Sequence, residues 1–405
     1  MIGAANNIGQ VATKPMPQSI KCVIMRGGTS KAVFLDDEAV PKDAAQRTAM
    51  ILRIFGSPDK RQIDGLGGAD PLTSKLAIIG KPPRGSNDVD VLYTFGQVEI
   101  DHPEIDYLSL CGNISSAVGP YAIYEGLVPP VAPMTLVRVY NTNLKRHLRV
   151  EVPVQDGLPV EEGDYEVPGV PGTGARIQVD FADTAGAATG NLLPTGKPVD
   201  RVEVPGVGPI DMSLVDIGNA HVFIRAADIG LGGTETAAEI DGNQTLRDKL
   251  ESIRAHAAFR MGMISKPEVS RSESPATPIL GIVSPPQSYS VALNGKTVDA
   301  SETDLTARVM FMQQAHKTYA GTSTVCTGVA RKIPGTLVAQ CARPETLGSP
   351  LVRIGHPGGV ITTEVSVEQR DGSLLVTRAT LGRTARRIMQ GQVFVPSATG
   401  SQPGH

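Results

Sequence analysis

Alternation of apolar and polar residues recurs along the chain and predicts a strand-rich fold. Strand-like segments occur at 21–26, 89–98, 136–140, 146–152, 176–181, 199–204, 210–215, 221–225, 279–283, 288–293, 351–354, 360–368, 373–379 and 392–395. Several of them alternate apolar and polar residues with period two, as strands with one solvated face do. Helical patterns are fewer and fall at 42–55, 113–124, 246–263, 305–316 and 324–331. This mixture predicts an α+β fold, not a regular alternation of strand and helix.

The two halves of the chain are loosely alike. Each half has strands and then a cysteine followed by small residues that open an apolar helix, at Cys111 and at Cys326. The stretch 182–198 is rich in Gly, Ala, Thr and Pro and has little periodicity, which predicts a boundary there. We therefore expect two pseudo-symmetric lobes, at 19–185 and 190–389, with both helix starts facing the cleft between them.

Composition narrows the class of protein. The 405 residues suffice for two domains, and the hydrophobic fraction of 40% is ordinary for a globular protein. A net charge of −3 argues against nucleic-acid or membrane partners, and no apolar run approaches the ~20 residues that span a bilayer. Residues 1–18 lack the features of a secretory signal and are interpreted as a loose leader. Four scattered cysteines and seven histidines without metal-ligand spacing predict no metal site and a reducing, cytoplasmic location.

The turn Leu-Cys-Gly-Asn-Ile at 110–114 places a thiol at a predicted helix start. A helix N-terminus presents unpaired amides and partial positive charge, which bind carboxylates and lower a thiol pKa. Gly112 allows close approach of a ligand, and Asn113 adds a hydrogen-bond donor. Cys111 is therefore a candidate general acid or base. The alternative is a small buried apolar side chain, the interpretation that we give to Cys22 and Cys341.

Lys75 is the second candidate for proton transfer. It follows a glycine-containing loop and begins an apolar run, Leu-Ala-Ile-Ile. At the edge of a cleft, desolvation and nearby cations would lower its pKa, so that it exchanges a proton with a carbon acid. In its protonated form it would stabilise an enolate-like dianion. The alternative is a solvated lysine at the end of a strand.

The turn Arg-Gly-Gly-Thr-Ser-Lys at 26–31 suits a carboxylate, which Arg26 can bind in a bidentate manner while Thr29 and Ser30 donate. Its spacing is not that of a phosphate-binding P-loop, and a plain tight turn is the alternative. No Gly-x-Gly-x-x-Gly follows a strand, so a nicotinamide cofactor is not indicated. The loop that begins at His356 is a further place where amides can face a cleft.

Ordered motifs at 25–31, 62–68, 70–75, 111–113, 140–143, 355–359 and 383–389 resemble those of the PrpF-type isomerases. This family includes 2-methylaconitate cis–trans isomerase, 4-oxalomesaconate tautomerase, and methylitaconate and aconitate isomerases. The resemblance spans about 20–397. It implies a diaminopimelate-epimerase-like fold in which each lobe wraps a strongly curved mixed sheet around a central helix. It also implies that 390–405 return to the first lobe and that substrate binds between the lobes without a cofactor.

For the site, the resemblance implies that Lys75 and Cys111 transfer protons and that Cys326 stands at the second lobe's helix start. The substrate-binding candidates are Arg26, Thr29, Ser30, Ser74, Gly112, Asn113, Thr327, Gly328 and His356. Which of Lys75 and Cys111 is the base stays open.

The activity we expect is a 1,3-allylic proton shift on an unsaturated di- or tricarboxylate such as aconitate, 2-methylaconitate or 4-oxalomesaconate. Two alternatives remain: an amino-acid epimerase that uses Cys111 and Cys326, and a non-catalytic metabolite-binding protein. The expected partner is a small carboxylate. A homodimer or a larger homo-oligomer is possible, and the sequence does not choose the substrate.

Overall fold

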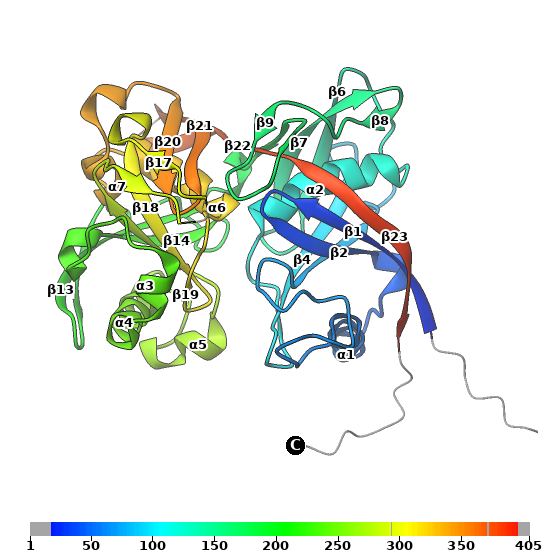
Figure 1. The fold of residues 1–405 in the computed structure, drawn as a ribbon, viewed down its shortest axis with the longest axis horizontal. Helices are drawn as coiled ribbons and strands as arrows, with labels where there is room; N and C mark the ends of the chain where they lie inside the picture. The colour runs from blue at the N-terminus through cyan, green and yellow to red at the C-terminus, as the bar shows by residue number, and fades with distance from the viewer. Residues whose placement is uncertain (1–17, 293, 371, 396–405) are drawn as a thin grey trace, which may run out of the picture.

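The molecule has two lobes side by side, each with one helix enclosed by strands (Figure 1). The structure is a computed structural model that describes residues 18–395 apart from 293 and 371. The predicted leader up to residue 17, and residues 396–405 of the predicted returning segment, lie outside the described residues. We call the elements from β1 to β11, with β23, the first lobe, and those from β12 to β22 the second lobe.

The first lobe begins with a hairpin and ends in a short strand before the boundary. Its strands are β1 (Gln18–Gly27), β2 (Ser30–Asp36), β3 (Lys75–Gly80), β4 (Val91–Val98), β5 (Ile105–Asp106), β6 (Met134–Asn141), β7 (Arg146–Gln155), β8 (Leu158–Pro159), β9 (Tyr165–Glu166), β10 (Thr173–Gly174), β11 (Ile177–Asp180) and β23 (Ala385–Val395). Its helices are α1 (Ala44–Phe55) and α2 (Gly112–Tyr124).

The second lobe repeats this plan with additional helices. Its strands are β12 (Asp200–Val204), β13 (Gly208–Ile217), β14 (Asn219–Arg225), β15 (Ile279–Ser284), β16 (Tyr289–Ser290), β17 (Thr297–Val298), β18 (Leu305–Phe311), β19 (Gln314–Ala315), β20 (Leu351–His356), β21 (Gly359–Arg370) and β22 (Ser373–Arg383). Its helices are α3 (Ala237–Asp241), α4 (Gln244–Arg260), α5 (Ser270–Glu273), α6 (Gly321–Lys332) and α7 (Leu337–Cys341).

The strand order shows that the lobes are pseudo-symmetric. In the first lobe the strands pair in the order β1–β2–β3–β4–β6–β7–β11, with β2–β3 and β4–β6 parallel. In the second lobe the order is β13–β14–β15–β18–β20–β21–β22, with β14–β15 and β18–β20 parallel. Each position in one series has its counterpart in the other. The two-lobed fold predicted from the sequence is therefore confirmed.

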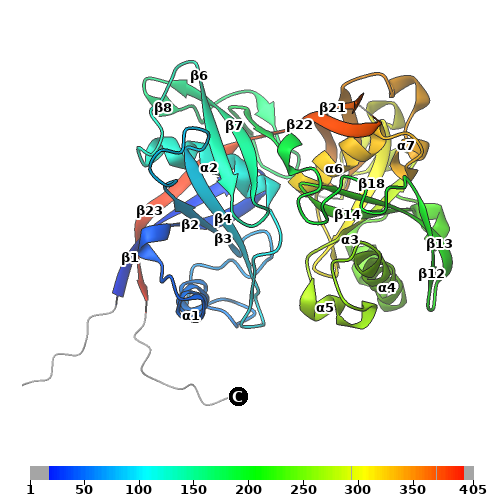
Figure 2. The same cartoon turned by 180° about the vertical axis from the view of Figure 1, so that it is seen from behind.

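The C-terminal strand crosses between the lobes. β22 pairs with β11, and β23 then runs along β1 from Ala385 opposite Gly27 to Val395 opposite Gln18 (Figure 2). The predicted return at 390 falls inside β23, so we propose residue 385 as the start of the returning segment. The predicted boundaries at 185 and 190 fall between β11 and β12.

Helices α2 and α6 lie inside the curved sheets and share one large hydrophobic core. In α2, every residue from Gly112 to Ile123 is buried, which explains why it is apolar all round. Smaller cores lie under α1 in the first lobe and under α4 in the second. The caps also follow local rules: the Asp43 side chain accepts a bond from Gln46 N, and Gly56 ends α1 with φ of 73°.

Three predicted elements need correction. The predicted helix at 305–316 is wrong, because β18 and β19 occupy it. β18 is a central strand between β15 and β20, and its burial on both faces removes the period-two signal. The predicted helix at 324–331 begins earlier, at Gly321. The predicted strand at 288–293 is reduced to Tyr289–Ser290, and residue 293 lies outside the described residues.

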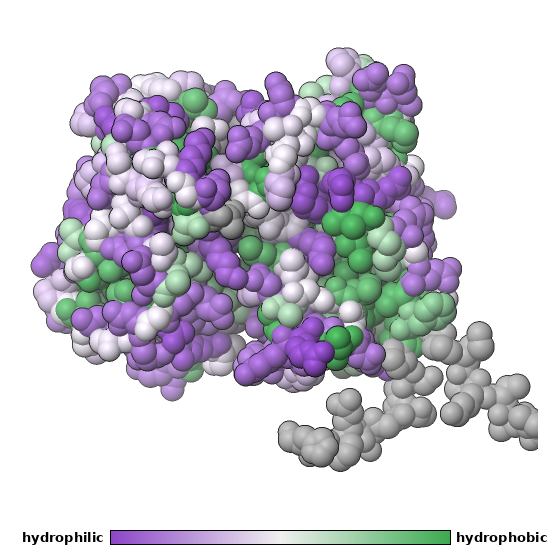
Figure 3. Space-filling view, viewed as in Figure 1, coloured by the Kyte–Doolittle hydropathy of each residue, from purple (hydrophilic) through white to green (hydrophobic). Residues whose placement is uncertain are grey.

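The surface is mainly polar, with apolar residues gathered near β1 and β23 of the first lobe (Figure 3). Ile388, Met389 and Phe394 of β23 are exposed. In the described part of the chain, no helix has the length and apolarity needed to cross a membrane. The same residues contain no group of three His, Cys, Asp or Glu side chains suited to a metal ion.

Candidate active site

Two helices from opposite lobes begin at the same place. A Cβ on Gly112, the first residue of α2, would lie 2.8 Å from Thr322 N and 2.9 Å from the Gly321 carbonyl carbon. A Cβ on Gly321, the first residue of α6, would lie 3.0 Å from the Gly112 carbonyl carbon. Glycine at both positions allows the two backbones to approach this closely. The two helix N-termini therefore meet at the boundary between the lobes.

Both helix starts lack a side-chain cap among the described residues. The N-cap positions are held by Cys111 and Ala320, and neither side chain makes a capping hydrogen bond. The first amides of a helix have no partner within the helix and carry partial positive charge. Two such ends side by side form a site suited to an anion such as a carboxylate.

A cavity opens at these helix starts, and the space in and in front of it, open solvent included, is about 750 Å³. The first lobe contributes Lys75 and Cys111 to its lining. Ser30, Gly112 and Asn113 line it as well. Five of the twelve residues predicted for the site therefore share one cavity.

Lys75 is buried in this cavity, with a relative exposure of 4%. Its Nζ donates to Gln97 Oε1 at 2.6 Å. The same nitrogen lies 5.4 Å from the ring centroid of Phe95 and 5.8 Å from that of Phe311. These contacts are a neutral amide and two aromatic faces, which hold the amine out of bulk water. The interpretation of Lys75 as a solvated lysine is therefore wrong.

The positions of the second lobe that correspond to Lys75 and Gln97 are apolar. Lys75 begins β3 and pairs with Gln97 on β4. In the second lobe β15 begins at Ile279, and the register of Leu280 with Met310 places Ile279 opposite Phe311. Ile279 and Phe311 both line the cavity. By strand order, Ile279 and Phe311 are thus the counterparts of Lys75 and Gln97.

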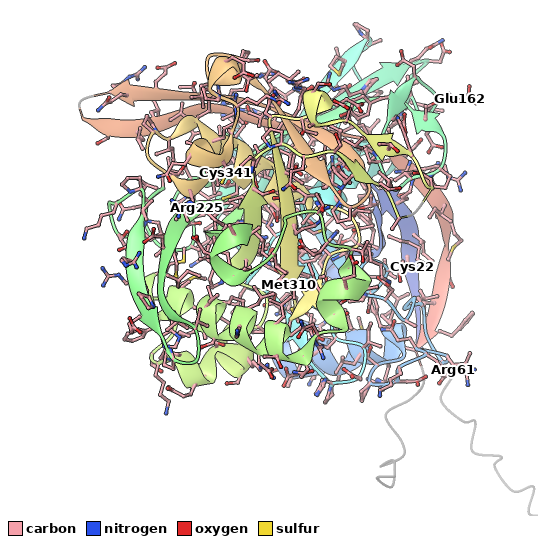
Figure 4. All side chains as sticks on the ribbon, turned by 60° about the vertical axis from the view of Figure 1, so that its left-hand side comes forward. Cys22, Arg61, Glu162, Arg225, Met310 and Cys341 are labelled. Atoms are coloured by element: carbon pink, nitrogen blue, oxygen red, sulfur yellow. The ribbon has the colours of Figure 1, made fainter. Side chains whose placement is uncertain are left out.

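Cys111 is the N-cap of α2, is partly exposed, and has a free thiol. Ala320 has the same position on α6. The paired thiols that a two-cysteine epimerase needs are therefore missing from the two helix starts. The other cysteines predicted to be small buried side chains, Cys22 and Cys341, are buried in the first and the second lobe respectively (Figure 4).

The prediction that Cys326 stands at a helix start is wrong. Because α6 begins at Gly321, Cys326 lies in its second turn and is fully buried. Its Sγ lies 3.7 Å from the carbonyl oxygen of Val215, and burial raises the pKa of this thiol well above its ordinary value. The sequence misled because residues 321–325 are small and buried, so no periodic signal marks the start of the helix.

Asn113 is tied to the protein by its side chain. Its Nδ2 donates to Thr29 Oγ1 at 3.0 Å and to Ser30 Oγ at 3.4 Å. Its Oδ1 accepts from Arg383 Nε at 2.7 Å, and burial lowers the pKa of Arg383 to about 10. The side chain therefore fixes the first hairpin turn against α2.

Asn219 of the second lobe also ties a helix start to a neighbouring turn through its side chain. The sequence analysis did not predict it as a site residue. Its Oδ1 accepts from Leu110 N at 2.9 Å, and its Nδ2 donates to Leu110 O at 2.8 Å and to Thr322 Oγ1 at 3.1 Å. It thereby joins the turn before Cys111 to the start of α6. The Gly-Asn pair between two predicted strands was the available signal.

An ion pair bridges the lobes at the cavity. Lys317, which precedes α6, lies 3.0 Å from Asp70 of the first lobe through its Nζ. Both residues, and the neighbouring His316, line the cavity. None of the three was predicted for the site, because only the folded arrangement brings residue 70 next to residue 317.

Two predicted residues of the first lobe donate hydrogen bonds to backbone carbonyl oxygens and do not line the cavity. Arg26 Nη1 donates to the carbonyl oxygens of Gly28 and Thr384, each at 3.0 Å. Ser74 is buried and donates to Val98 O at 2.9 Å. Neither residue lies in the cavity lining.

Three predicted residues of the second lobe lie in its interior. Thr327 bonds through Oγ1 to the Tyr319 hydroxyl at 2.8 Å, and Gly328 packs closely against Thr363 of β21. His356 is buried, and its Nδ1 accepts from Gly358 N at 3.1 Å. The structure does not bring these three residues to the cavity.

Comparison with known families agrees with this geometry. A family model described as PrpF protein matches residues 17–396. The chain belongs to the PrpF family. Among its relatives, the 3-methylitaconate isomerase of Eubacterium barkeri is 51% identical over 94% of this chain and 98% of its own length. The 2-methyl-aconitate isomerase of Shewanella oneidensis is 39% identical over 95% of this chain and all of its own length. This PrpF-family chain is therefore an enzyme of the isomerase class.

Solved structures extend the comparison to the fold. A methylitaconate-delta-isomerase matches with a TM-score of 0.79 and 50% identity, over 96% of this chain and 99% of the other. A probable proline racemase from Agrobacterium radiobacter matches with a TM-score of 0.55 at 13% identity, over 94% of each chain. The second likeness concerns the fold alone, and it places this PrpF-family chain in the diaminopimelate-epimerase-like class.

Proposed function

We propose that this PrpF-family isomerase moves a proton between the two ends of an allylic system in an unsaturated di- or tricarboxylate, without a cofactor. The observation that carries the proposal is the meeting of two proton-transfer groups, Lys75 and Cys111, with two uncapped helix starts in one cavity. The helix starts suit the carboxylates of the substrate. The amine and the thiol are the groups able to exchange protons with carbon.

In the proposed reaction, Lys75 or Cys111 removes a proton from the carbon next to the double bond. The electron pair of that C–H bond moves into the allylic system and onto a carboxylate oxygen, which gives a dienolate. The amides at Gly112 and Asn113 stabilise this charge. A proton then returns to the far carbon, so that the product is an isomer with a moved double bond or a changed cis–trans geometry.

Ultraviolet absorbance tests the proposal directly. Purified protein would be mixed in turn with aconitate, 2-methylaconitate, methylitaconate and oxalomesaconate, and the reaction repeated in D2O with mass analysis of the product. We expect a change of absorbance with at least one acid and one deuterium in its product. No conversion of any of these acids by the wild-type protein would refute the proposed function.

Two apolar side chains of the cavity, Ile279 and Phe311, favour a substrate that carries a methyl group. Ile279 and Phe311 offer no hydrogen-bonding group, and the relative with 51% identity is named for a methyl-substituted acid. We expect Ile279→Thr to lower kcat/KM for the methylated acid relative to its unmethylated analogue by about 10-fold or more, since one methyl group in an apolar pocket contributes about 1–3 kcal/mol. The exposed Ile63→Thr is the control. An unchanged ratio in the Ile279 variant would contradict the methyl assignment.

The epimerase alternative requires both Cys111 and Cys326 for activity, whereas the proposed isomerase does not require Cys326. Cys326 is fully buried inside α6, whereas Cys111 lies at the cavity. We expect Cys326→Ala to keep kcat within about 2-fold, and Cys111→Ala to lower it by about 100-fold, the lower end of the range for a general acid or base. Turnover assays of both variants distinguish the two functions. Racemisation of an amino acid that disappears in Cys326→Ala would favour the epimerase.

A further inference from the structure

His316 lies in the loop between β19 and α6 and lines the cavity from the second lobe. The backbone at His316 and at the preceding residue is fixed. His316 N donates to Val309 O at 2.8 Å, and Ala315 N donates to an Asp241 carboxylate oxygen at 2.8 Å. Hydrogen bonds to strand β18 and helix α3 therefore hold the backbone that carries the ring.

The hydrogen bonds of the ring determine where its proton is. Thr318 N donates to His316 Nδ1 at 3.1 Å. A backbone amide only donates, so Nδ1 must be the unprotonated nitrogen, and a neutral ring carries its proton on Nε2. Because Nδ1 is turned towards its own loop, Nε2 is the nitrogen available to a ligand in the cavity.

The surroundings keep the ring neutral. Burial, and then the nearby charge of Lys75, lower the pKa of His316 to about 4. The hydrogen bond with the Thr318 backbone and the charge of Asp70 act in the opposite direction, and Arg383 adds to the effect of Lys75. At neutral pH the ring is therefore a hydrogen-bond donor and not a cation.

We propose that His316 is a catalytic residue whose neutral imidazole donates a hydrogen bond from Nε2 to the carboxylate oxygen that becomes negatively charged in the reaction. This assignment rests on the proposed function. The proton removed from carbon goes to Lys75 or Cys111 and returns from one of them, while His316 keeps its own proton throughout. The charge is then stabilised from both lobes: by the amides of Gly112 and Asn113 on one side and by His316 on the other.

The first test compares three variants in the turnover assay. We expect His316→Ala to lower kcat by about 100- to 1,000-fold, the range for removal of one oxyanion donor. His316→Gln, whose amide still donates, should recover part of this loss. His256→Ala, which replaces a half-buried histidine of α4, should match the wild type. Because the ring of His316 stays neutral, it should add no step of its own to the pH dependence of kcat. Between pH 5 and 8 we therefore expect the wild type and His316→Gln to have pH profiles of the same shape. A His316→Ala variant as active as the wild type would overturn the assignment while leaving the proposed function intact.

The second test does not depend on turnover. Nitrogen NMR of the histidine rings in the full-length protein distinguishes a protonated from a bare nitrogen. We expect His316 to carry its proton on Nε2, and this signal to shift when tricarballylate, a saturated tricarboxylate, is added. A proton on Nδ1, or an Nε2 signal unmoved at saturating tricarballylate, would overturn the assignment even if none of the unsaturated acids were a substrate.

Discussion

Replacement of Lys75 by methionine is expected to lower kcat by about 100- to 10,000-fold, the contribution typical of a general acid or base. Methionine has nearly the same length and fits between the rings of Phe95 and Phe311. It removes a buried amine that contacts a neutral amide and two rings, and it keeps the volume of the side chain, so the fold should tolerate it. One donor to Gln97 Oε1 is lost, although the amide nitrogen of Gln97 still donates to Pro71 O and Ser74 O.

The measurement is turnover of the best substrate, together with urea unfolding of the same protein. Lys81→Met is the matched control, because Lys81 directly follows the same strand and is exposed. We expect Lys81→Met to keep both activity and stability. If Lys75→Met unfolds at the wild-type urea concentration and still turns over substrate at the wild-type rate, Lys75 has no part in proton transfer.

The strands were predictable because most of them have one solvated face. The alternation at 146–152 in β7, for example, follows directly from burial of every second side chain. β18 was mistaken for a helix because both of its faces are covered, and β2 gave no prediction for the same reason. Burial of both faces did not hide every strand, because the apolar runs of β14 and β15 were recognised at 221–225 and 279–283.

The site was predictable only where its signal was local. Lys75 stood out because a polar group led an apolar run, and Cys111 because Gly-Asn followed it. Gln97 and His316 have no such signal, since Gln97 reaches Lys75 through strand register and His316 reaches the cavity through the meeting of two lobes. Cys326 misled because its small neighbours resembled a helix start that the fold places five residues earlier.

Substitution of Gly112 by alanine tests whether the meeting of the two helix starts is needed for function. The new Cβ would lie 2.8 Å from Thr322 N, and both nearest groups are backbone, which cannot rotate away. Overpacking of this kind costs about 1–3 kcal/mol of unfolding free energy, and the better helix propensity of alanine offsets about 1 kcal/mol of it. We expect the remaining strain to separate α2 from α6 and so to move the amides that, in the proposed function, bind the substrate carboxylate.

We therefore expect Gly112→Ala to lose more activity than stability: kcat/KM should fall by about 100-fold, since a misplacement of about 1 Å costs this much, while the unfolding free energy changes by at most about 2 kcal/mol. Gly348→Ala is the control, because its Cβ would meet no atom within 4 Å. Urea unfolding and the kinetics of both variants give the comparison. Wild-type kinetics in Gly112→Ala would mean that the two helix starts can separate without harm, and that the carboxylate site depends on one lobe alone. The loss should appear in kcat more than in KM, because in the proposed reaction the amides at this junction bind the developing charge more strongly than the charge already present in the substrate.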